Sequence, residues 1–222
     1  MLQPEFRSLL QAESSRAGLQ LEAGCLDRLT CHYQLLVKWS RAMRLVGSTD
    51  PATVVGRHIL ESLSLLPYVP EPRGSLLDIG SGNGFPAIPL KCALPDLRLG
   101  MVEPTIRKGA FLTTAIAQLG LTDAEVIRGR VDRQRDLARL GRWDCITMRA
   151  VAAIPAVLSG AEQALRPGGR LLFLVGCQGR DEIYRRLTPT LELHAVHQLP
   201  GTRASFLAVV TLNHRDSSTT VH

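Results

Sequence analysis

A glycine-rich segment follows a short apolar stretch in LLDIGSGNGF, residues 76–85. Residues 75–79 predict a short buried strand, and Gly80, Gly82 and Gly84 follow it at alternate positions. In an open α/β sheet, ligands bind beyond the carboxyl ends of the strands, where the strand order reverses. Glycines there permit a tight turn and let a ligand approach the backbone closely. The segment is therefore a candidate ligand-binding loop.

Two common glycine-rich loops do not fit this segment. The dinucleotide-binding fingerprint requires glycine where this chain has Phe85, and the phosphate-binding P-loop requires a GK[ST] sequence that is absent. The GxGxG spacing after an acidic strand end suits S-adenosylmethionine instead, because that molecule has no phosphate to bind. Glycine turns follow strands in many α/β folds, so the loop needs support from other positions.

Two acidic side chains are expected near this loop. Glu103 ends the next predicted strand, 19 residues after Gly84, where its carboxylate can accept hydrogen bonds from both hydroxyls of a ribose. Asp132 follows the third predicted strand and can accept from an adenine amino group. Two alternatives stay open: Asp132 is equally suited to pair with nearby arginines, and Glu103 can be an ordinary surface residue.

Basic residues are concentrated in one segment of the chain. The net charge of +6 is compatible with a polyanionic partner. The segment is either a patch that contacts phosphates or a solvated face whose charges pair with interspersed aspartates. Its arginines are Arg128, Arg130, Arg133, Arg135, Arg139 and Arg142.

The cysteines and histidines lack the spacing of a metal site. The five cysteines are scattered, with no CxxC pair, which argues against a disulfide framework or a zinc site. His194 and His197 are three residues apart in an extended stretch, so they are expected to point to opposite faces of a strand. We therefore predict no metal site.

Helices are predicted for the first seventy residues, ahead of the loop. Residues 26–43 have apolar side chains at three- and four-residue spacing, which predicts an amphipathic helix. Residues 51–66 predict another helix, with Asp50 as its N-cap and Pro51 in its first turn. Residues 67–75 contain three prolines and a glycine and are the predicted linker.

After the linker, strands alternate with helices, which predicts a mostly parallel sheet covered on both faces. The last two strands have no helix between them, so we expect an antiparallel hairpin at one edge, which is typical of class I methyltransferases. Helices are expected near Pro86, over residues 107–120 with Gly120 closing the helix, and from residue 154 to a stop at Pro167 and the two glycines after it. The predicted strands are residues 75–79, 97–103, 124–131, 144–150, 169–175, 191–199 and 204–212.

The predicted fold class is α/β, a Rossmann-like class I methyltransferase sheet with an N-terminal helical extension. Residues 1–70 are assigned to the extension, packed on the core, 71–213 to the S-adenosylmethionine-dependent methyltransferase domain, and 214–222 to a flexible tail. No stretch resembles a signal peptide or approaches the roughly 20 apolar residues of a membrane span. We therefore expect a cytoplasmic protein with no membrane partner, and a monomer, since no long apolar stripe suggests an obligate dimer.

Several strings of the chain resemble the bacterial family of small-subunit ribosomal RNA guanine-N7 methyltransferases known as RsmG, or glucose-inhibited division protein B (GidB). The resemblance runs from about residue 30 to about residue 185. The GSGxGxPxIPL form, with Pro86 and Pro89, is much narrower than a generic methyltransferase loop. The strings are YQLLVKW (33–39), HILESL (58–63), LLDIGSGNGFPAIPL (76–90), VEPTIRKGAFL (102–112), GRVD (129–132) and MRAVAAI (148–154).

The resemblance implies S-adenosyl-L-methionine as cofactor, and 16S ribosomal RNA or the small ribosomal subunit as partner. Arg107 and Lys108 stand where the family carries paired basic residues and are candidates for binding RNA phosphates. Val175 departs from the family, which commonly has a lysine there. The implied cofactor residues are Gly80, Gly82 and Phe85 around the loop, Glu103 on the ribose, Val131 and Asp132 beside the adenine, and Arg149 at the reactive end or target base.

Guanine N7 has an exposed lone pair and no proton, so its methylation needs no general base, and no catalytic base is predicted. The enzyme's contribution is then orientation at near-attack distance, since the cofactor's methyl group is already activated. We hypothesise that Arg149 holds the cofactor carboxylate or the O6 of the base with the bidentate fork of its guanidinium, which a lysine cannot reproduce.

Other functions stay open on the sequence alone. A methyltransferase acting on another RNA or on a small molecule would have the same cofactor motifs. A non-catalytic S-adenosylmethionine-binding ribosome assembly factor is a further alternative, because Val175 replaces the family's lysine. An NAD(P)-dependent oxidoreductase is disfavoured by Phe85 and by the lack of Tyr/Lys or Cys/His chemistry nearby.

Overall fold

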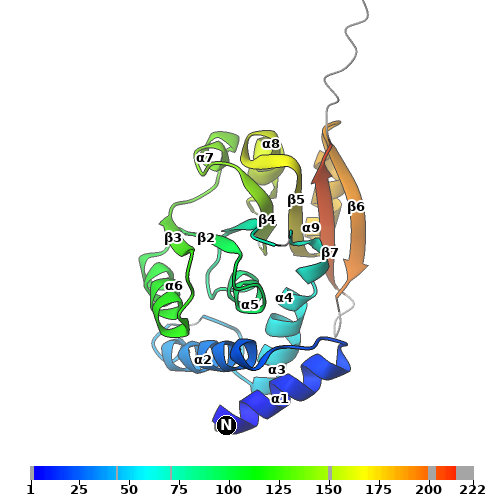
Figure 1. The fold of residues 1–222 in the computed structure, drawn as a ribbon. Helices are drawn as coiled ribbons and strands as arrows, with labels where there is room; N and C mark the ends of the chain where they lie inside the picture. Colours follow the sequence, from blue (N-terminus) through cyan, green and yellow to red (C-terminus); the bar gives the residue numbers. More distant parts are fainter. Residues whose placement is uncertain (1–2, 44, 71, 150–151, 200–203, 214–222) are drawn as a thin grey trace, which may run out of the picture.

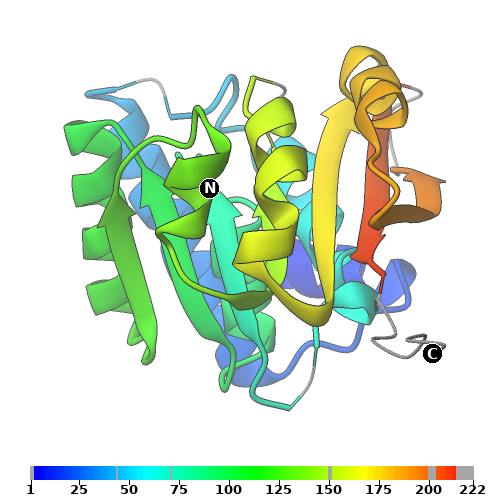
Figure 2. The ribbon, with the colours of Figure 1, turned by 90° about the horizontal axis from the view of Figure 1, so that it is seen from above.

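A seven-stranded sheet in the order β3-β2-β1-β4-β5-β7-β6 forms the centre of the molecule (Figures 1 and 2). The computed structural model describes residues 3–43, 45–70, 72–149, 152–199 and 204–213. Strands β1 to β5 are parallel, and β7 pairs antiparallel with both β5 and β6. The strands are β1 (Ser75–Ile79), β2 (Arg98–Glu103), β3 (Ala124–Arg128), β4 (Trp143–Met148), β5 (Leu165–Gly176), β6 (Leu191–Gln198) and β7 (Ser205–Leu212).

Helices cover both faces of this sheet (Figure 1). One face carries α7 (Gln134–Ala138), α8 (Ile154–Ala164) and α9 (Cys177–Arg186). The opposite face carries all the N-terminal helices together with α5 and α6. These are α1 (Gln3–Arg16), α2 (Ala23–Ser40), α3 (Pro51–Val54), the π-helix η1 (Val55–Leu60), α4 (Glu61–Leu63), the 3-10 helix η2 (Leu66–Tyr68), α5 (Ala87–Ala93) and α6 (Ile106–Leu119).

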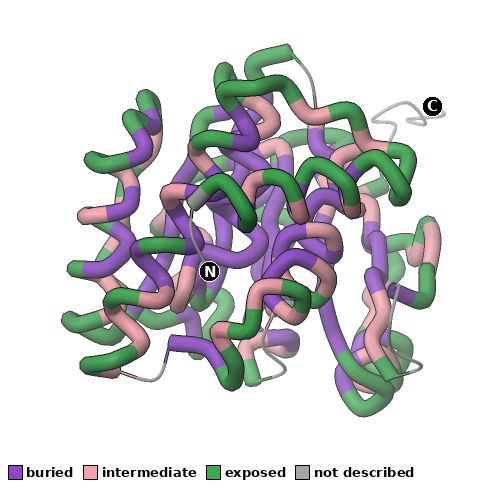
Figure 3. Tube along the Cα trace, turned by 90° about the horizontal axis from the view of Figure 1, so that it is seen from below, coloured by how far each residue is buried: buried purple, intermediate pink, exposed green. Residues whose placement is uncertain are grey.

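The buried side chains form two hydrophobic clusters, one on each face of the sheet. Successive residues of a strand point to opposite faces, so Leu76 lies in one cluster and Leu77 in the other. Phe6 and Leu29 of the N-terminal helices are fully buried in the same cluster as Leu76. The interior of the molecule is coloured as buried in Figure 3, and β1 is buried at every residue, as expected for a parallel sheet covered on both sides.

The predicted fold class and the antiparallel hairpin at the sheet edge are confirmed, with β7 inserted between β5 and β6. Asp50 caps its helix, because its carboxylate accepts from the Thr53 N–H at 2.8 Å. Gly120 closes α6 in the left-handed conformation, with φ of 61°. The predicted tail, residues 214–222, lies outside the described residues, as does Ala150 of the MRA string.

The structure differs from the predicted elements at several places, and α7 between β3 and β4 is a helix for which no prediction was made. The helix predicted over residues 51–66 is interrupted by the π-helical turn η1. The helix predicted from residue 154 to a stop at Pro167 already ends at Ala164, because Leu165 pairs with Trp143 and a bulge absorbs the residues before Arg170. Helix α9 was not predicted, because Gly179 and Ile183 are its only buried residues and leave no apolar period to detect.

The carboxyl ends of three adjacent strands meet at one place. Ile79 pairs in register with Val102 of β2 and with Met148 of β4. Strand β1 thus lies where the order of the sheet reverses, which is where α/β sheets bind their ligands. None of the described helices is long and apolar enough to cross a membrane.

Candidate cofactor-binding site

The loop after β1 exposes its backbone at Gly80 and Gly82. Both residues have positive φ, 75° and 55°, a conformation that favours glycine. A Cβ built on Gly80 would have nothing within 4 Å, and one on Gly82 would meet only the Gly80 carbonyl at 3.7 Å. Open space therefore borders the loop, and a ligand can approach the main chain closely.

Gly84 has a different role from these two glycines. Its φ is 84°, and a Cβ there would overlap the side chain of Ile88, with Cγ1 at 2.9 Å. The His32 Nε2 atom would lie 3.4 Å from the same Cβ. Gly84 is therefore required for close packing of the loop on α5 and α2 rather than for access by a ligand.

Glu103 connects the end of β2 to the loop. Its Oε2 accepts from the Gly82 N–H at 2.9 Å, and its Oε1 accepts from the Thr105 N–H at 2.8 Å. The residue is only 4% exposed. A carboxylate oxygen has two lone pairs, so each oxygen can accept one further hydrogen bond. The strand-end position of Glu103 follows from the sequence, whereas its bond to the loop does not.

Asp78 is a buried acid directly beneath the loop. Its Oδ1 accepts from the Thr147 hydroxyl at 2.8 Å, while Oδ2 has no hydrogen-bond partner among the described residues. Burial raises the pKa of this carboxyl to about 6, against smaller opposing contributions from Ser81 and Thr147. The sequence marks Asp78 only as an acidic strand end, and its unsatisfied oxygen is a structural finding.

Val131 and Asp132 follow β3 in an irregular segment. Val131 is buried, whereas the Asp132 side chain is 59% exposed and forms an ion pair with Arg130 at 2.8 Å. The interpretation of Asp132 as a partner for nearby arginines therefore matches a contact that the structure contains. Its interpretation as an adenine acceptor stays a prediction.

Arg149 follows β4 and is bound by three groups of the N-terminal helices. Its Nη2 donates to Glu61 Oε2 at 2.5 Å and to the Arg57 carbonyl at 2.9 Å. Its Nη1 lies 3.3 Å from His58 Nδ1. Burial, followed by the charges of Arg149 and Arg57, lowers the pKa of His58 to about 4, so its neutral ring can accept from Nη1.

These contacts change the hypothesis of a bidentate contact from Arg149 to a ligand. A guanidinium offers two forks, and both of them include Nη2. Both N–H groups of Nη2 already donate to protein oxygens, those of Glu61 and Arg57. Neither fork is therefore free to bind a ligand through two hydrogen bonds. Among the described residues, Nε and one N–H of Nη1 have no protein acceptor, so a ligand would receive single hydrogen bonds.

Phe85 lies between two imidazoles rather than against open space. Its ring stacks on His58, with centroids 5.0 Å apart, and contacts His32 at 4.9 Å. The residue is 3% exposed, so its ring is packed inside the protein. Neither histidine was predicted as a site residue, because neither lies in a recognisable spacing with the loop.

His32 holds the loop from α2. Its Nε2 lies 3.0 Å from the Asn83 carbonyl and acts as the donor, while its buried Nδ1 has no partner among the described residues. Burial lowers the pKa of His32 to about 4, so the ring is neutral near pH 7. The Asn83 side chain also donates to the Leu45 carbonyl at 3.2 Å. The N-terminal helices therefore fix the shape of the loop.

A match to a protein-family model identifies the family to which this chain belongs. The family model described as rRNA small subunit methyltransferase G matches residues 26–202, which include every element of the site. The chain belongs to this family.

Relatives of known name agree with this assignment. The ribosomal RNA small subunit methyltransferase G of Ralstonia nicotianae is 39% identical over 188 residues, covering 82% of this chain and 83% of the relative. The protein of the same name from Desulfitobacterium hafniense is 34% identical, over 81% and 75% of the two chains.

Solved structures share the fold at low sequence identity. A SAM-dependent methyltransferase from Aquifex aeolicus has a TM-score of 0.58 at 12% identity, over 73% of this chain and 94% of that chain. TrmN from Thermus thermophilus has a TM-score of 0.58 at 20% identity, over 71% and 53% of the chains. The predicted class I methyltransferase fold is thus confirmed.

The predicted RNA contacts lie on exposed parts of the methyltransferase G fold. Arg107 is exposed and Lys108 half-buried in the first turn of α6, beside the end of β2. The six arginines of residues 128–142 are all exposed. Arg130 pairs with Asp132, and Arg142 donates to the carbonyls of Glu162 and Leu165. The charge of Arg130 is thus neutralised within the chain, whereas Arg142 keeps its charge.

Val175, which replaces the family's common lysine, lies in β5 opposite Phe206. It is 5% exposed and belongs to the cluster beneath α8 and α9. Its side chain therefore packs in the hydrophobic core of this chain.

The histidine pair and the cysteines form no centre in the described part of the chain. His197 Nε2 lies 2.5 Å from the Tyr68 hydroxyl, which connects β6 to η2. The five cysteines are free. Within the described residues, no group of three His, Cys, Asp or Glu side chains could hold a metal ion.

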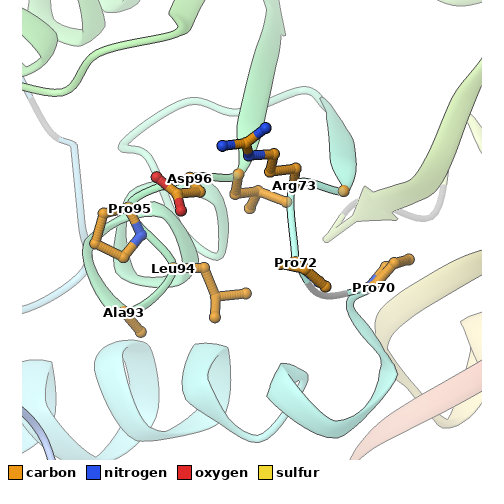
Figure 4. A pocket seen from close by; sticks show the side chains of 9 residues that line it. Pro70, Pro72, Arg73, Ala93, Leu94, Pro95 and Asp96 are labelled. Atoms are coloured by element: carbon orange, nitrogen blue, oxygen red, sulfur yellow. The ribbon is translucent and has the colours of Figure 1, made fainter.

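A cavity of about 270 Å³ lies at the other end of the strands, beside the amino ends of β1 and β2. Figure 4 shows Arg73 and Asp96 beside the prolines that line it. Ligands of such sheets bind at the carboxyl ends of the strands, so this cavity is separate from the candidate site.

Proposed function

We propose that this chain transfers a methyl group from S-adenosylmethionine to N7 of a guanine in 16S ribosomal RNA. The observation that supports this function best is the match of the methyltransferase G family model to residues 26–202. The relatives that are 34–39% identical are named as methyltransferases of the small-subunit ribosomal RNA. The guanine N7 target rests on the family resemblance of the sequence.

The residues at the carboxyl ends of β1 and β2 fit the proposed cofactor. The backbone at Gly80 is open, and the Glu103 carboxylate has lone pairs for two ribose hydroxyls. When bound, the cofactor would supply a methyl group already activated by its sulfonium. The residues proposed to hold it are Gly80, Gly82, Phe85, Glu103, Val131, Asp132 and Arg149.

We assign no general base, because guanine N7 has a lone pair and no proton to lose. The chain's contribution is to orient the base and to hold the loop rigid, which His32 and Glu103 do from α2 and β2. Arg107 and Lys108 are proposed to bind RNA phosphates, because they flank the same edge of the sheet.

The remaining assignments are also proposals. Residues 1–70 form the helical extension and 71–213 the methyltransferase domain, supported by the helices that end at Tyr68 and the sheet that begins at Ser75. A monomer in the cytoplasm is the state we propose for the working enzyme, since its substrate would be ribosomal RNA.

Labelled methyl transfer tests the proposed function. The purified chain and labelled S-adenosylmethionine are incubated separately with 16S RNA, small subunits and 23S RNA. We expect label in the 16S RNA or the small subunit and none in the 23S RNA. Equal labelling of 23S RNA, or no labelling by a protein that binds S-adenosylhomocysteine, would contradict the proposal.

A further inference from the structure

Arg149 is held by a buried carboxylate from a different part of the chain. Glu61 lies 88 residues away in sequence, its side chain is 2% exposed, and its Oε2 accepts from Arg149 Nη2 at 2.5 Å. Its other oxygen, Oε1, is buried without a partner among the described residues. A buried carboxylate with one partner is costly unless that partner is charged and fixed, so the two side chains depend on each other.

The π-helical turn η1 supplies the other contacts to Arg149. A π-helix disturbs the regular ladder of backbone hydrogen bonds and is frequent at functional sites. Within this turn, the Arg57 carbonyl accepts from Nη2 and the His58 ring lies against Nη1. His58 also stacks on Phe85 at the end of the loop. One short segment thus contacts both the guanidinium and the loop.

We propose that Glu61 is the positioning residue for Arg149 in the methyl-transfer reaction, an inference that rests on the proposed function. The carboxylate and the Arg57 carbonyl fix the guanidinium plane by occupying both N–H groups of Nη2. Arg149 then offers single N–H donors in a defined direction to the cofactor or the base. Glu61 itself touches neither, and acts through Arg149.

A double-mutant cycle tests this role. Glu61→Gln, Arg149→Met and the double variant are compared with the wild type for kcat and KM of methyl transfer to 16S RNA. We expect Glu61→Gln to lower kcat at least tenfold with little change in KM for RNA. In the Arg149→Met background, Glu61→Gln should cause no further loss. Wild-type kcat in Glu61→Gln, or losses that multiply in the double variant, would overturn the proposal.

Further variants separate positioning from folding. Glu61→Asp keeps the charge and should recover more of the activity than Glu61→Gln. Thermal unfolding of each variant checks the fold, and if Arg149→Met does not fold, the cycle uses Arg149→Lys. Asp144→Asn is the matched control, because Asp144 pairs with Arg166 at 2.7 Å at the amino edge of the sheet. It should keep wild-type kcat whatever it loses in stability.

Failure of the proposed function would be recognisable in the same set of proteins. Absence of transfer by the wild type would refute the function, and the cycle would then be measured on the Kd of S-adenosylhomocysteine by calorimetry. Non-additive changes in Kd would support positioning by Glu61. An unchanged Kd in Glu61→Gln would overturn it.

Discussion

The carboxylate of Glu103 accepts a hydrogen bond from the backbone N–H of Gly82 at 2.9 Å. Through this bond, the end of β2 fixes the loop that follows β1, although the two residues are 21 positions apart. Glu103, which is proposed to bind the ribose of the cofactor, therefore also supports the loop. Replacing Glu103 should affect both the shape of the site and its affinity for the cofactor.

Glu103→Gln is expected to weaken binding of S-adenosylhomocysteine by about 10- to 100-fold, the value of a hydrogen bond to a charged group. An amide has one acceptor oxygen, so its NH2 group would face either Gly82 or Thr105, which are both donors. Calorimetric titration measures the effect. Glu125→Gln on exposed β3 is the control and should bind normally, and an unchanged Kd for Glu103→Gln would remove the assigned role.

Gly80→Ala and Gly84→Ala are expected to fail in different ways. Gly80→Ala adds a methyl group to open space and should cost about 1 kcal/mol of stability through its positive φ, while abolishing stabilisation by S-adenosylhomocysteine. Gly84→Ala overlaps Ile88 and should cost about 3 kcal/mol. Thermal unfolding with and without S-adenosylhomocysteine separates the two, and normal ligand stabilisation of Gly80→Ala would contradict the assignment of that loop.

Asp78→Asn is expected to stabilise the fold at neutral pH. The pKa of Asp78 in the folded protein, about 6, lies above the ordinary value of 3.8. The stability that the protonated side chain contributes is therefore fully present below pH 3.8 and is lost as the pH rises through 6. Above pH 7 the variant should gain on the order of 2 to 3 kcal/mol of unfolding free energy. Urea unfolding from pH 7.5 to 4.5 should show this gain shrinking, whereas a gain independent of pH would argue against a buried acid.

The opposite pH dependence is expected of His32. Its folded pKa of about 4 lies below the ordinary 6.5, so its contribution is present above pH 6.5 and is lost as pH falls through 4. His32→Gln keeps a donor for the Asn83 carbonyl and cannot be charged. Between pH 7 and pH 4, the free energy of unfolding of the variant should therefore fall by about 3 kcal/mol less than that of the wild type. Identical acid unfolding curves for the two proteins would contradict this.

The loop and its acid could be predicted because both follow directly from strand ends. Leu76, Leu77 and Ile79 mark a short buried strand that ends directly before the loop. Glu103 ends the next strand, so its position in the sequence alone places it near the loop. The parallel sheet and the edge hairpin follow from the alternation of elements, whereas the order of the strands was not predicted. The predicted strands differ from the observed ones mainly at their ends.

The contacts of Arg149 could not be predicted, because they join residues about 90 positions apart through a turn with no sequence signature. The apolar spacing of residues 51–66 fits a regular helix, whereas the structure has a π-turn there whose residues contact Arg149 and the loop. His32 was missed for a similar reason: its partner Asn83 is 51 residues away. Tertiary contacts, not local pattern, position these side chains.

Mapping the methylated atom of the RNA shows directly whether this chain is a guanine-N7 methyltransferase. Small subunits labelled by the purified wild-type chain are treated with a reagent that cleaves RNA at N7-methylguanine, and the ends are identified by primer extension. We expect cleavage at one guanine of 16S RNA, with an N7-methylguanine yield equal to the transferred label. Label on another atom or in another RNA, or cleavage at many guanines, would contradict it.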